Sequence, residues 1–249
     1  MVVAEPIDLL RRMAPSWFSL TEVSSEAMQG HAVVAVANGV GRTVADLRIT
    51  AHLGKATVSE TVVGTAFPAR CSERHIEWDG AFCIGYRAGV AIHTVDQAVV
   101  WWGLLEQFLR LQRVACRTRH WPVRQAIAHG EAGPHHIRAL EAARELGLEE
   151  DYFQMLEGEP RWFAGRFPRL NKDSDRLLNG RLRCPKGCLR KGKPILRRDC
   201  TKTDVICLLL REERLQRKKE HEFWKGERFL GVTCCGTMDN CPLSSFRKS

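Results

Sequence analysis

The stretch "ERHIEWDGAFCIGY", residues 73–86, is the most informative part of the sequence for function. It places Cys83 directly after Gly80-Ala81-Phe82, with His75 eight positions and Asp79 four positions before the cysteine. A cysteine in this setting is a buried small hydrophobe, a metal ligand or a nucleophile. The interpretation of the chain depends on which of the three applies.

Each role has its own requirement. Free cysteine is among the most buried residue types, so a structural role for Cys83 is the plain alternative. Cys71, His75 and Cys83 together offer three soft ligands of the kind that zinc accepts. A nucleophile needs an accessible thiol on an irregular segment, and Gly80 permits a tight turn and close substrate approach there. His75 and Asp79 are the polar groups that the same segment supplies.

The flanking sequence predicts an α+β order of elements. Runs rich in Val, Thr and Ile, separated by Gly-containing breaks, predict an antiparallel meander of strands, and apolar residues at helical spacing predict helices on both sides of it. The strands are expected at 31–40, 45–53 and 56–64. The helices are expected at 5–13, with Pro6 in the first turn, and at 94–116, 121–130, 133–147 and 149–156.

This order resembles a ubiquitin-conjugating (E2) domain over about residues 1–125. In that family the catalytic cysteine lies within a pattern of His-Pro-Asn, a short loop, Gly, one residue, Ile, Cys and Leu. Gly80-Ala81-Phe82-Cys83-Ile84 matches the second half of this pattern. More narrowly, the chain resembles the cysteine-rich E2-like proteins of bacterial ubiquitin-like and antiphage (CBASS-type) operons. The stretches that carry this likeness are "WWGLLEQFLRLQRVACRTRHWP" (101–122), "HGEAG" (129–133) and "CCGTMDNCPL" (234–243).

The resemblance implies that Cys83 carries an activated C-terminal acyl group as a thioester and passes it to an amine in antiphage defence. The acyl group would belong to a ubiquitin-like modifier or partner protein. His75 and Asp79 are the further catalytic candidates. "HIE" (75–77) stands where the family has His-Pro-Asn, two residues closer to the cysteine, so an Asn is missing. Asp79 or a backbone N–H could substitute, and a carboxylate could orient or deprotonate an attacking lysine.

The implied partners are an E1-like activating enzyme and a modifier or target protein, with a cyclic-nucleotide synthase among the candidates. The start of the chain lacks the pattern of a secretory signal, and no apolar run approaches the ~20 residues that span a bilayer. We therefore expect a cytoplasmic protein with no membrane partner. Two alternatives remain: an inactive E2-like scaffold, and a zinc- and nucleic-acid-binding module with an inert E2-like body.

Charge and cysteines both divide the chain near residue 180. Residues 181–249 hold 18 Lys and Arg against 8 Asp and Glu, a net charge of +10, whereas the whole chain carries +9. We therefore expect an E2-like domain with a helical extension at 1–180 and a basic cysteine-rich module at 181–249. Its amphipathic helix at 208–230 and its net charge suit an anionic partner, either nucleic acid or an acidic protein surface.

Seven of the ten cysteines lie in this second module. A reducing cytosol disfavours disulfides, so clustered cysteines there favour metal binding, and a small module with few aromatics gains stability from a structural zinc. The predicted ligands are drawn from Cys184, Cys188, Cys200, Cys207, Cys234, Cys235 and Cys241. The favoured set is Cys184, Cys188 and Cys200 with one of Cys207, Cys234 or Cys235.

Overall fold

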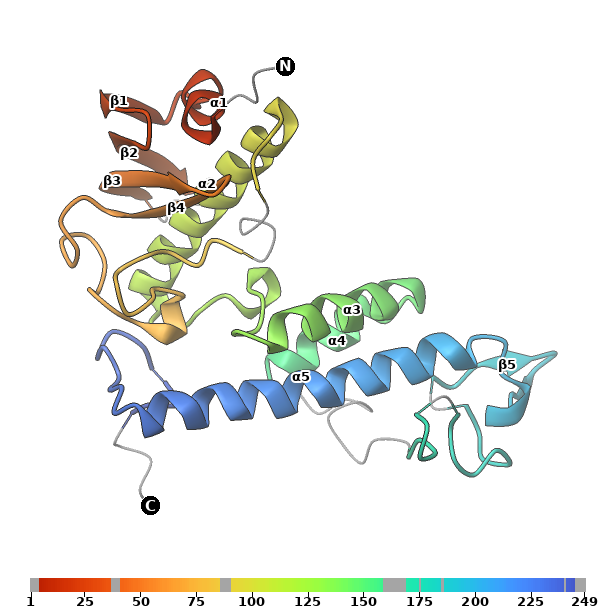
Figure 1. Cartoon of the computed structure of the whole chain (residues 1–249). Coiled ribbons are helices and arrows are strands. Elements are labelled where there is room, and N and C mark those ends of the chain that lie inside the picture. The colour runs from red at the N-terminus through yellow and green to blue at the C-terminus, as the bar shows by residue number, and fades with distance from the viewer. Residues whose placement is uncertain are drawn as a thin grey trace. The chain divides into compact units, whose positions relative to one another are not determined.

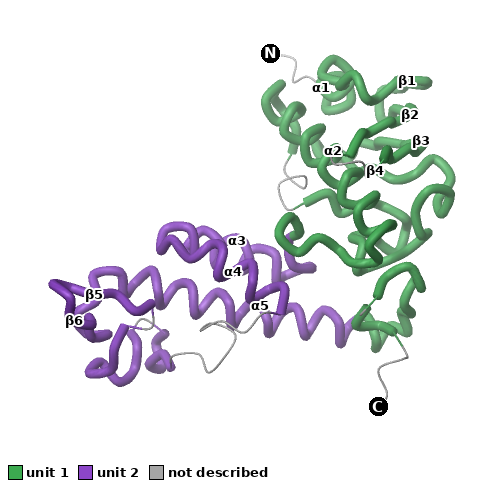
Figure 2. The backbone as a smooth tube through the Cα atoms, turned by 180° about the vertical axis from the view of Figure 1, so that it is seen from behind, with its two compact units in different colours: residues 1–126, 227–249 green, residues 127–226 purple. Residues whose placement is uncertain are grey.

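The computed structural model describes residues 5–36, 41–85, 91–158, 169–174, 176–184, 186–239 and 241–244. The chain forms two compact units, shown in different colours in Figure 2. Unit 1 comprises residues 1–126 and 227–249, and unit 2 comprises residues 127–226. No helix in the described part of the chain is both long and apolar enough to cross a membrane.

Unit 1 is built on an antiparallel sheet of four strands in the order β1-β2-β3-β4 (Figure 1). The strands are β1 (Phe18–Val23), β2 (Ala27–Val36), β3 (Gly41–His52) and β4 (Lys55–Glu60). Burial alternates along β2, β3 and β4, so one face of the sheet meets the core and the other meets solvent. This is the expected α+β meander. β1 has only Phe18 buried and therefore gave no alternating signal in the sequence.

Two helices cover the buried face of this sheet: α1 (Pro6–Arg12) and α2 (Val95–Thr118). Thr94 caps α2, because its side chain accepts from the Gln97 backbone N–H while the Gln97 side chain accepts from the Thr94 backbone N–H. The buried side chains of α2 are Ala98, Trp101, Trp102, Leu105, Phe108, Leu109, Leu111, Gln112 and Ala115. Trp102 also donates its indole N–H to the Leu10 carbonyl of α1 at 2.9 Å, which ties the two helices together.

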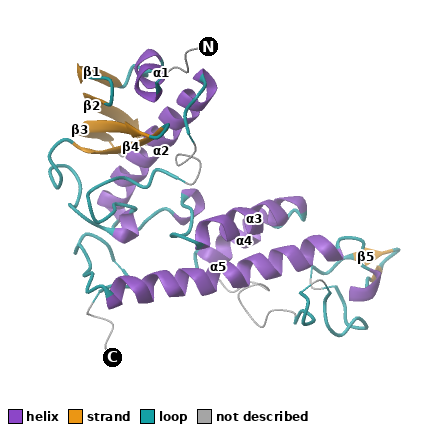
Figure 3. Ribbon diagram, in the orientation of Figure 1, coloured by secondary structure: helices purple, strands orange, loops and turns teal. Residues whose placement is uncertain are grey.

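Unit 2 is mainly helical, as Figure 3 shows. It contains α3 (Ala132–Glu145), α4 (Glu149–Leu156) and most of α5 (Thr203–Phe229). Its strands β5 (Leu189–Arg190) and β6 (Lys193–Pro194) form a two-stranded sheet. α5 packs Ile206, Leu209 and Leu210 into the core of this unit together with Tyr152 of α4. The expected helices at 133–147, 149–156 and 208–230 are thus present.

The helix predicted at 121–130 is wrong. Only a short 3-10 turn, Val123–Gln125, forms there, and Ala126 is extended. Inside unit 2, the backbone N–H groups that follow bond to side chains instead of helical carbonyls. Ala128 N–H donates to His136 Nδ1 at 3.1 Å, and His129 N–H donates to Glu220 Oε2 at 2.9 Å. Apolar spacing could not reveal this long-range competition for the backbone.

The division of the chain also differs from the expected boundary near residue 180. Residues 181–226 belong with α3 and α4 in unit 2, and residues 227–249 belong with the sheet in unit 1. Net charge, on which the expected boundary rested, acts over long distances and does not specify packing. Apolar side chains specify it here, since Met238 and Cys241 are buried in the core of unit 1.

Replacing Leu105 by Ala should lower the free energy of unfolding by about 2–5 kcal/mol, because Leu105 is fully buried in α2 and leaves a cavity. The matched control is Val99→Ala on the exposed side of the same helix, with an expected change within about 0.5 kcal/mol. Urea unfolding followed by tryptophan fluorescence measures both. Equal losses for the two variants would contradict the assigned face of α2.

Candidate active site

Cys83 lies at the end of a short antiparallel pairing between residues 75–77 and 81–83. Glu77 N–H donates to the Ala81 carbonyl at 2.8 Å, and Cys83 N–H donates to the His75 carbonyl at 2.9 Å. These two bonds place Ile76 opposite Phe82 as a pair without mutual hydrogen bonds. Phe82 N–H also donates to the Val58 carbonyl of β4 at 2.8 Å, so the pairing extends the sheet beyond its last strand.

The register of this pairing decides which side chains meet solvent. Side chains alternate between the two faces of paired strands. Ile76 and Phe82 face the core and are 1% and 7% exposed. Glu77, Ala81 and Cys83 therefore share the opposite face, and Glu77 and Cys83 are both exposed. Cys83 lies outside regular helices and strands, as the nucleophile interpretation expects.

The turn between the paired segments explains Gly80 and gives Asp79 a structural contact. Gly80 has φ +82°, and a Cβ on it would lie 2.8 Å from the side chain of Val63, so only glycine fits. Asp79 Oδ1 accepts the backbone N–H of Ala81 at 3.0 Å. The carboxylate of Asp79 thus holds the turn that precedes Cys83. Its predicted catalytic role stays a prediction.

His75 supports the same segment from its other end. Its carbonyl receives the Cys83 N–H, its φ of 55° is left-handed, and its ring centroid lies 5.1 Å from that of Trp121. The catalytic role predicted for the His75 ring likewise stays a prediction. The backbone contact places His75 next to the candidate nucleophile.

A buried arginine anchors this segment to α2. Arg74 is 3% exposed, and its Nε donates to Gln112 Oε1 of α2 at 2.8 Å. The Gln112 side chain in turn donates to the Arg74 carbonyl at 2.7 Å. Burial lowers the pKa of Arg74, while the nearby Cys71, Cys116 and Cys235 act in the opposite direction. Because each partner satisfies the other, this reciprocal pair fixes the turn Ser72–Arg74 against the core.

A second buried polar residue, Glu60 at the end of β4, holds the loop next to the site. Its carboxylate accepts backbone N–H groups from Gly64, Ala66 and Phe67 at 3.0, 2.5 and 3.4 Å. Phe67 then packs edge-on against Phe82, with ring centroids 5.4 Å apart. The sequence carried no signal for Glu60 or Arg74, because both act through contacts with distant backbone.

The electrostatic surroundings of Cys83 disfavour its thiolate. Partial burial of the sulfur is the largest cause, the negative charge of Glu77 is the second, and together they raise the pKa of Cys83. A backbone hydrogen bond from Gly85 partly offsets them. In the sequence, Glu77 was noted only because "HIE" (75–77) stands where the family has His-Pro-Asn. The alternation of the pairing places it on the face of Cys83.

The C-terminal segment of unit 1 packs on the turn that leads to this site. Cys71 Sγ and Cys235 Sγ lie 2.7 Å apart, and Cys235 Sγ lies 3.0 Å from Thr237 Oγ1. The contact between the two thiols is the largest cause of two opposite shifts: it raises the pKa of Cys71 and lowers the pKa of Cys235.

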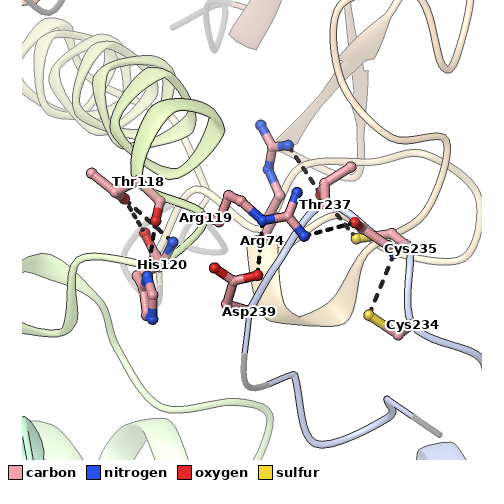
Figure 4. Close-up of polar contacts among 9 residues, drawn as sticks. Arg74, Thr118, Arg119, His120, Cys234, Cys235, Thr237 and Asp239 are labelled. Atoms are coloured by element: carbon pink, nitrogen blue, oxygen red, sulfur yellow. Dashed lines mark hydrogen bonds and ion pairs between the residues drawn. The ribbon is translucent and has the colours of Figure 1, made fainter. Parts of the chain in front are cut away.

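Arg119, just after α2, holds the same C-terminal segment. Its Nε donates to Asp239 Oδ1 at 2.8 Å, and another of its nitrogens donates to the Gly236 carbonyl at 3.1 Å (Figure 4). Arg74 adds a contact to Thr237 at 3.4 Å. Arg74 and Arg119 thus both bind the C-terminal segment of unit 1.

Four of the predicted metal ligands lie in unit 2: Cys184, Cys188, Cys200 and Cys207. Cys184 and Cys207 are buried, and Cys188 and Cys200 pack against the same core. Cys184 N–H donates to the Ile195 carbonyl at 2.7 Å, and Ile195 N–H donates to the Cys188 carbonyl at 2.9 Å, which brackets the β5–β6 hairpin. Burial, and then the contact with Cys184, raise the pKa of Cys188.

The remaining predicted ligands, Cys234, Cys235 and Cys241, lie in unit 1. The soft thiols of either unit suit zinc by their chemistry. As placed, however, no three His, Cys, Asp or Glu side chains among the described residues are arranged to hold a metal ion. Zinc binding by these cysteines therefore stays a prediction.

Part of the basic charge of α5 is neutralised within unit 2. Lys219 contacts Glu131 at 2.7 Å and Glu222 at 3.2 Å, Arg217 pairs with Glu213, and Arg211 lies 3.2 Å from Glu212. Ion pairs of this kind are ordinary features of a charged helix. An anionic partner for the basic module at residues 181–249 stays a prediction.

The antiparallel sheet flanked by helices is consistent with an E2-like domain, and comparison with protein families identifies one. The model of the prokaryotic E2 domain matches residues 17–123. The model of a cysteine-rich domain C-terminal to the E2 domain matches residues 128–243. The chain belongs to the bacterial E2-like proteins that carry this cysteine-rich domain. Among curated proteins and among solved structures, no match was found.

Iodoacetamide should modify Cys83 and spare Cys71, because Cys83 is exposed whereas Cys71 is 4% exposed. Since only the thiolate reacts and the pKa of Cys83 is raised, its alkylation rate should still be rising above pH ~8.5, where a free cysteine is half ionised. Peptide mapping by mass spectrometry over pH 6–10 measures this profile. A Cys83 that stays unmodified at pH 10 would contradict the exposed placement.

Proposed function

We propose that the chain is an E2-like acyl transferase that carries an activated C-terminal acyl group as a thioester on Cys83. The single observation that carries the proposal is the register of residues 75–83, which turns Cys83 to solvent while its neighbours Phe82 and Ile84 stay buried. Cys83 is an exposed residue with a partly buried sulfur, on a segment held by main-chain hydrogen bonds, and this exposure gives the access that acyl exchange needs. The family to which the chain belongs favours this chemistry over a purely structural cysteine.

The proposed reaction is an exchange between thioesters followed by transfer to an amine. The Cys83 thiolate attacks the carbonyl carbon of the acyl group held on an E1-like partner, the new C–S bond forms, and the partner's thiolate leaves. An amine, most simply a lysine, then attacks the Cys83 thioester, and Cys83 leaves as the thiolate. Neither step needs a bound cofactor, because the activating partner spends the ATP.

The raised pKa of Cys83 shapes this proposal. At neutral pH most of the free cysteine is protonated, so the charging step benefits from a partner that removes the thiol proton. The thioester itself is neutral, so it escapes the repulsion that the Glu77 carboxylate exerts on the thiolate. The site therefore favours the loaded form of Cys83 relative to its free thiolate.

The basic cysteine-rich module (181–249) is proposed to hold a structural zinc through Cys184, Cys188, Cys200 and Cys207. All four cysteines lie in unit 2. Its support is the bracketed β5–β6 hairpin and the contact between Cys184 and Cys188. Zinc would draw these thiols into a tetrahedral set and would add folding free energy to a segment with little regular structure. A role in antiphage defence, with a modifier or a cyclic-nucleotide synthase as target, belongs to the same proposal and rests on the family resemblance.

Cys83→Ala should abolish thioester formation, because the variant lacks the only atom that bonds to the acyl carbon. The matched control is Cys116→Ala, which removes an exposed thiol from α2 and should leave the thioester yield unchanged. The measurement is the intact mass of the protein after incubation with a short peptide α-thioester that ends in glycine. An adduct of equal yield on Cys83→Ala would overturn the proposal.

Native mass spectrometry should find about one zinc per chain, as four thiolate ligands imply. Cys188→Ser should lose this zinc and make the region around residues 184–207 sensitive to protease, whereas Cys116→Ser should retain both. A protein that is free of metal and still resists protease in this region would contradict the zinc proposal and leave the Cys83 proposal untouched.

A further inference from the structure

We propose that Cys71 and Cys235 form a reversible disulfide, which fastens the C-terminal segment of unit 1 to the turn before Cys83. This redox role is independent of the acyl transfer proposed for Cys83, and it gives Cys235 a function other than metal binding. The first observation is a distance: the two sulfur atoms lie 2.7 Å apart, although 164 positions of sequence separate the residues. Both residues lie in unit 1.

The separation of the two sulfur atoms favours a bond over a shared metal ion. A disulfide bond is about 2.05 Å long. Two thiolates on one tetrahedral zinc, each about 2.3 Å from the metal, lie roughly 3.8 Å apart. The observed 2.7 Å is closer to the bond than to the shared zinc. In the described part of the chain, no third His, Cys, Asp or Glu side chain completes a metal-binding group with these two thiols.

Non-covalent contacts already hold both partners in place. Arg70 and Ser72 lie on either side of the buried cysteine, and both donate to the carboxylate of Glu227, Arg70 at 3.3 Å. Arg119 holds the residues that follow Cys235. Since these contacts keep the two thiols together, the second step of disulfide formation is intramolecular and has a high effective concentration.

The surroundings of the two sulfur atoms assign them different roles. Cys71 is 4% exposed, whereas Cys235 is half-buried, so an oxidant reaches Cys235 first. Thr237 Oγ1 lies 3.0 Å from Cys235 Sγ and accepts a hydrogen bond from Arg74 at 3.4 Å (Figure 4). Because arginine has only donors, the hydroxyl proton of Thr237 is left for the sulfur. A donor and a nearby cation favour the thiolate, which is the form that attacks a disulfide.

The oxidant that this site would use is a small-molecule disulfide of the glutathione class. The Cys235 thiolate attacks one sulfur of oxidised glutathione, a mixed disulfide forms on Cys235, and one glutathione thiolate leaves. Cys71 then loses its proton and attacks Cys235 Sγ, and the second glutathione leaves as a thiolate. The two protein thiols thereby lose two electrons and two protons, and two molecules of reduced glutathione form. Excess reduced glutathione reverses both steps.

The bond would act on the support of the candidate active site. Cys71 and Ile76 exchange two backbone hydrogen bonds, of 3.1 and 3.0 Å, and Ile76 stands opposite Phe82 in the pairing that presents Cys83. A disulfide at Cys71 therefore fastens the C-terminal segment to a residue that directly supports this pairing. In a reducing compartment such a bond is transient, so its occupancy follows the level of oxidised thiols.

The test incubates the full chain with mixtures of reduced and oxidised glutathione, blocks free thiols with N-ethylmaleimide and maps peptides without reduction. The wild type should yield a peptide that links Cys71 to Cys235 and that dithiothreitol separates. Cys71→Ser should accumulate glutathione on Cys235, because the thiol that displaces it is gone. Cys235→Ser should form no glutathione adduct on Cys71, because Cys71 is buried. The matched control Cys116→Ser should form the link as the wild type does.

Two results would overturn the proposal. The first is a wild type that yields no such linked peptide at any glutathione ratio, or that links Cys235 to a different cysteine. The second comes from native mass spectrometry of the reduced proteins: a zinc that the wild type holds and that both Cys71→Ser and Cys235→Ser lose would identify a metal site instead. Because the linked peptide is read in the wild type, the proposal can be tested even if a variant fails to fold.

Amide hydrogen exchange tests the fastening role itself. In the oxidised wild type, the Ile76 N–H should exchange more slowly than in the reduced wild type, because the disulfide opposes local opening of the turn that supplies its acceptor. The Gly147 N–H, which donates to the Arg144 carbonyl at 2.9 Å in unit 2, is the internal control and should exchange equally in both forms. Equal exchange of the Ile76 N–H in the two forms would contradict the fastening role.

Discussion

The site depends on one constraint, the pairing of residues 75–77 with 81–83 on the edge of β4. Two main-chain hydrogen bonds set its register, and a slip by one residue would turn every side chain to the opposite face. Ile76 and Phe82 are held against the core, and this burial makes the observed register the favoured one. That register explains why Cys83 is exposed and why Glu77 lies on the same face as Cys83.

Several distant parts of unit 1 maintain this pairing. Arg74 and Gln112 fix the preceding turn to α2, and Glu60 holds the loop that brings Phe67 against Phe82. The C-terminal segment adds the contact of Cys235 with Cys71 at the same turn. Residues that the family comparison assigns to the cysteine-rich domain thus complete the support of the E2-like site. This arrangement offers a physical reason for the two domains to occur in one chain.

The sequence predicted those features that depend on local pattern. Helical spacing located α2, α3, α4 and α5, and the segment around Gly80 was consistent with an accessible, irregular position for Cys83. It failed where distant groups decide the outcome. Residues 121–130 lose their helix to side-chain acceptors such as Glu220, and residues 227–249 join unit 1 through buried apolar contacts that net charge does not report. Only the register shows that Glu77 shares a face with Cys83, because spacing along the chain does not show which residues of two paired segments lie on the same face.

The most direct test of this account is the register itself, read by nuclear Overhauser effects in the full chain. A pair without mutual hydrogen bonds brings its two Cα protons close together. The account therefore predicts a strong cross-peak between the Hα protons of Ile76 and Phe82. A strong cross-peak from Ile76 to Ala81 or Cys83 instead would show a slipped register, would turn Cys83 toward the core, and would contradict the proposed site.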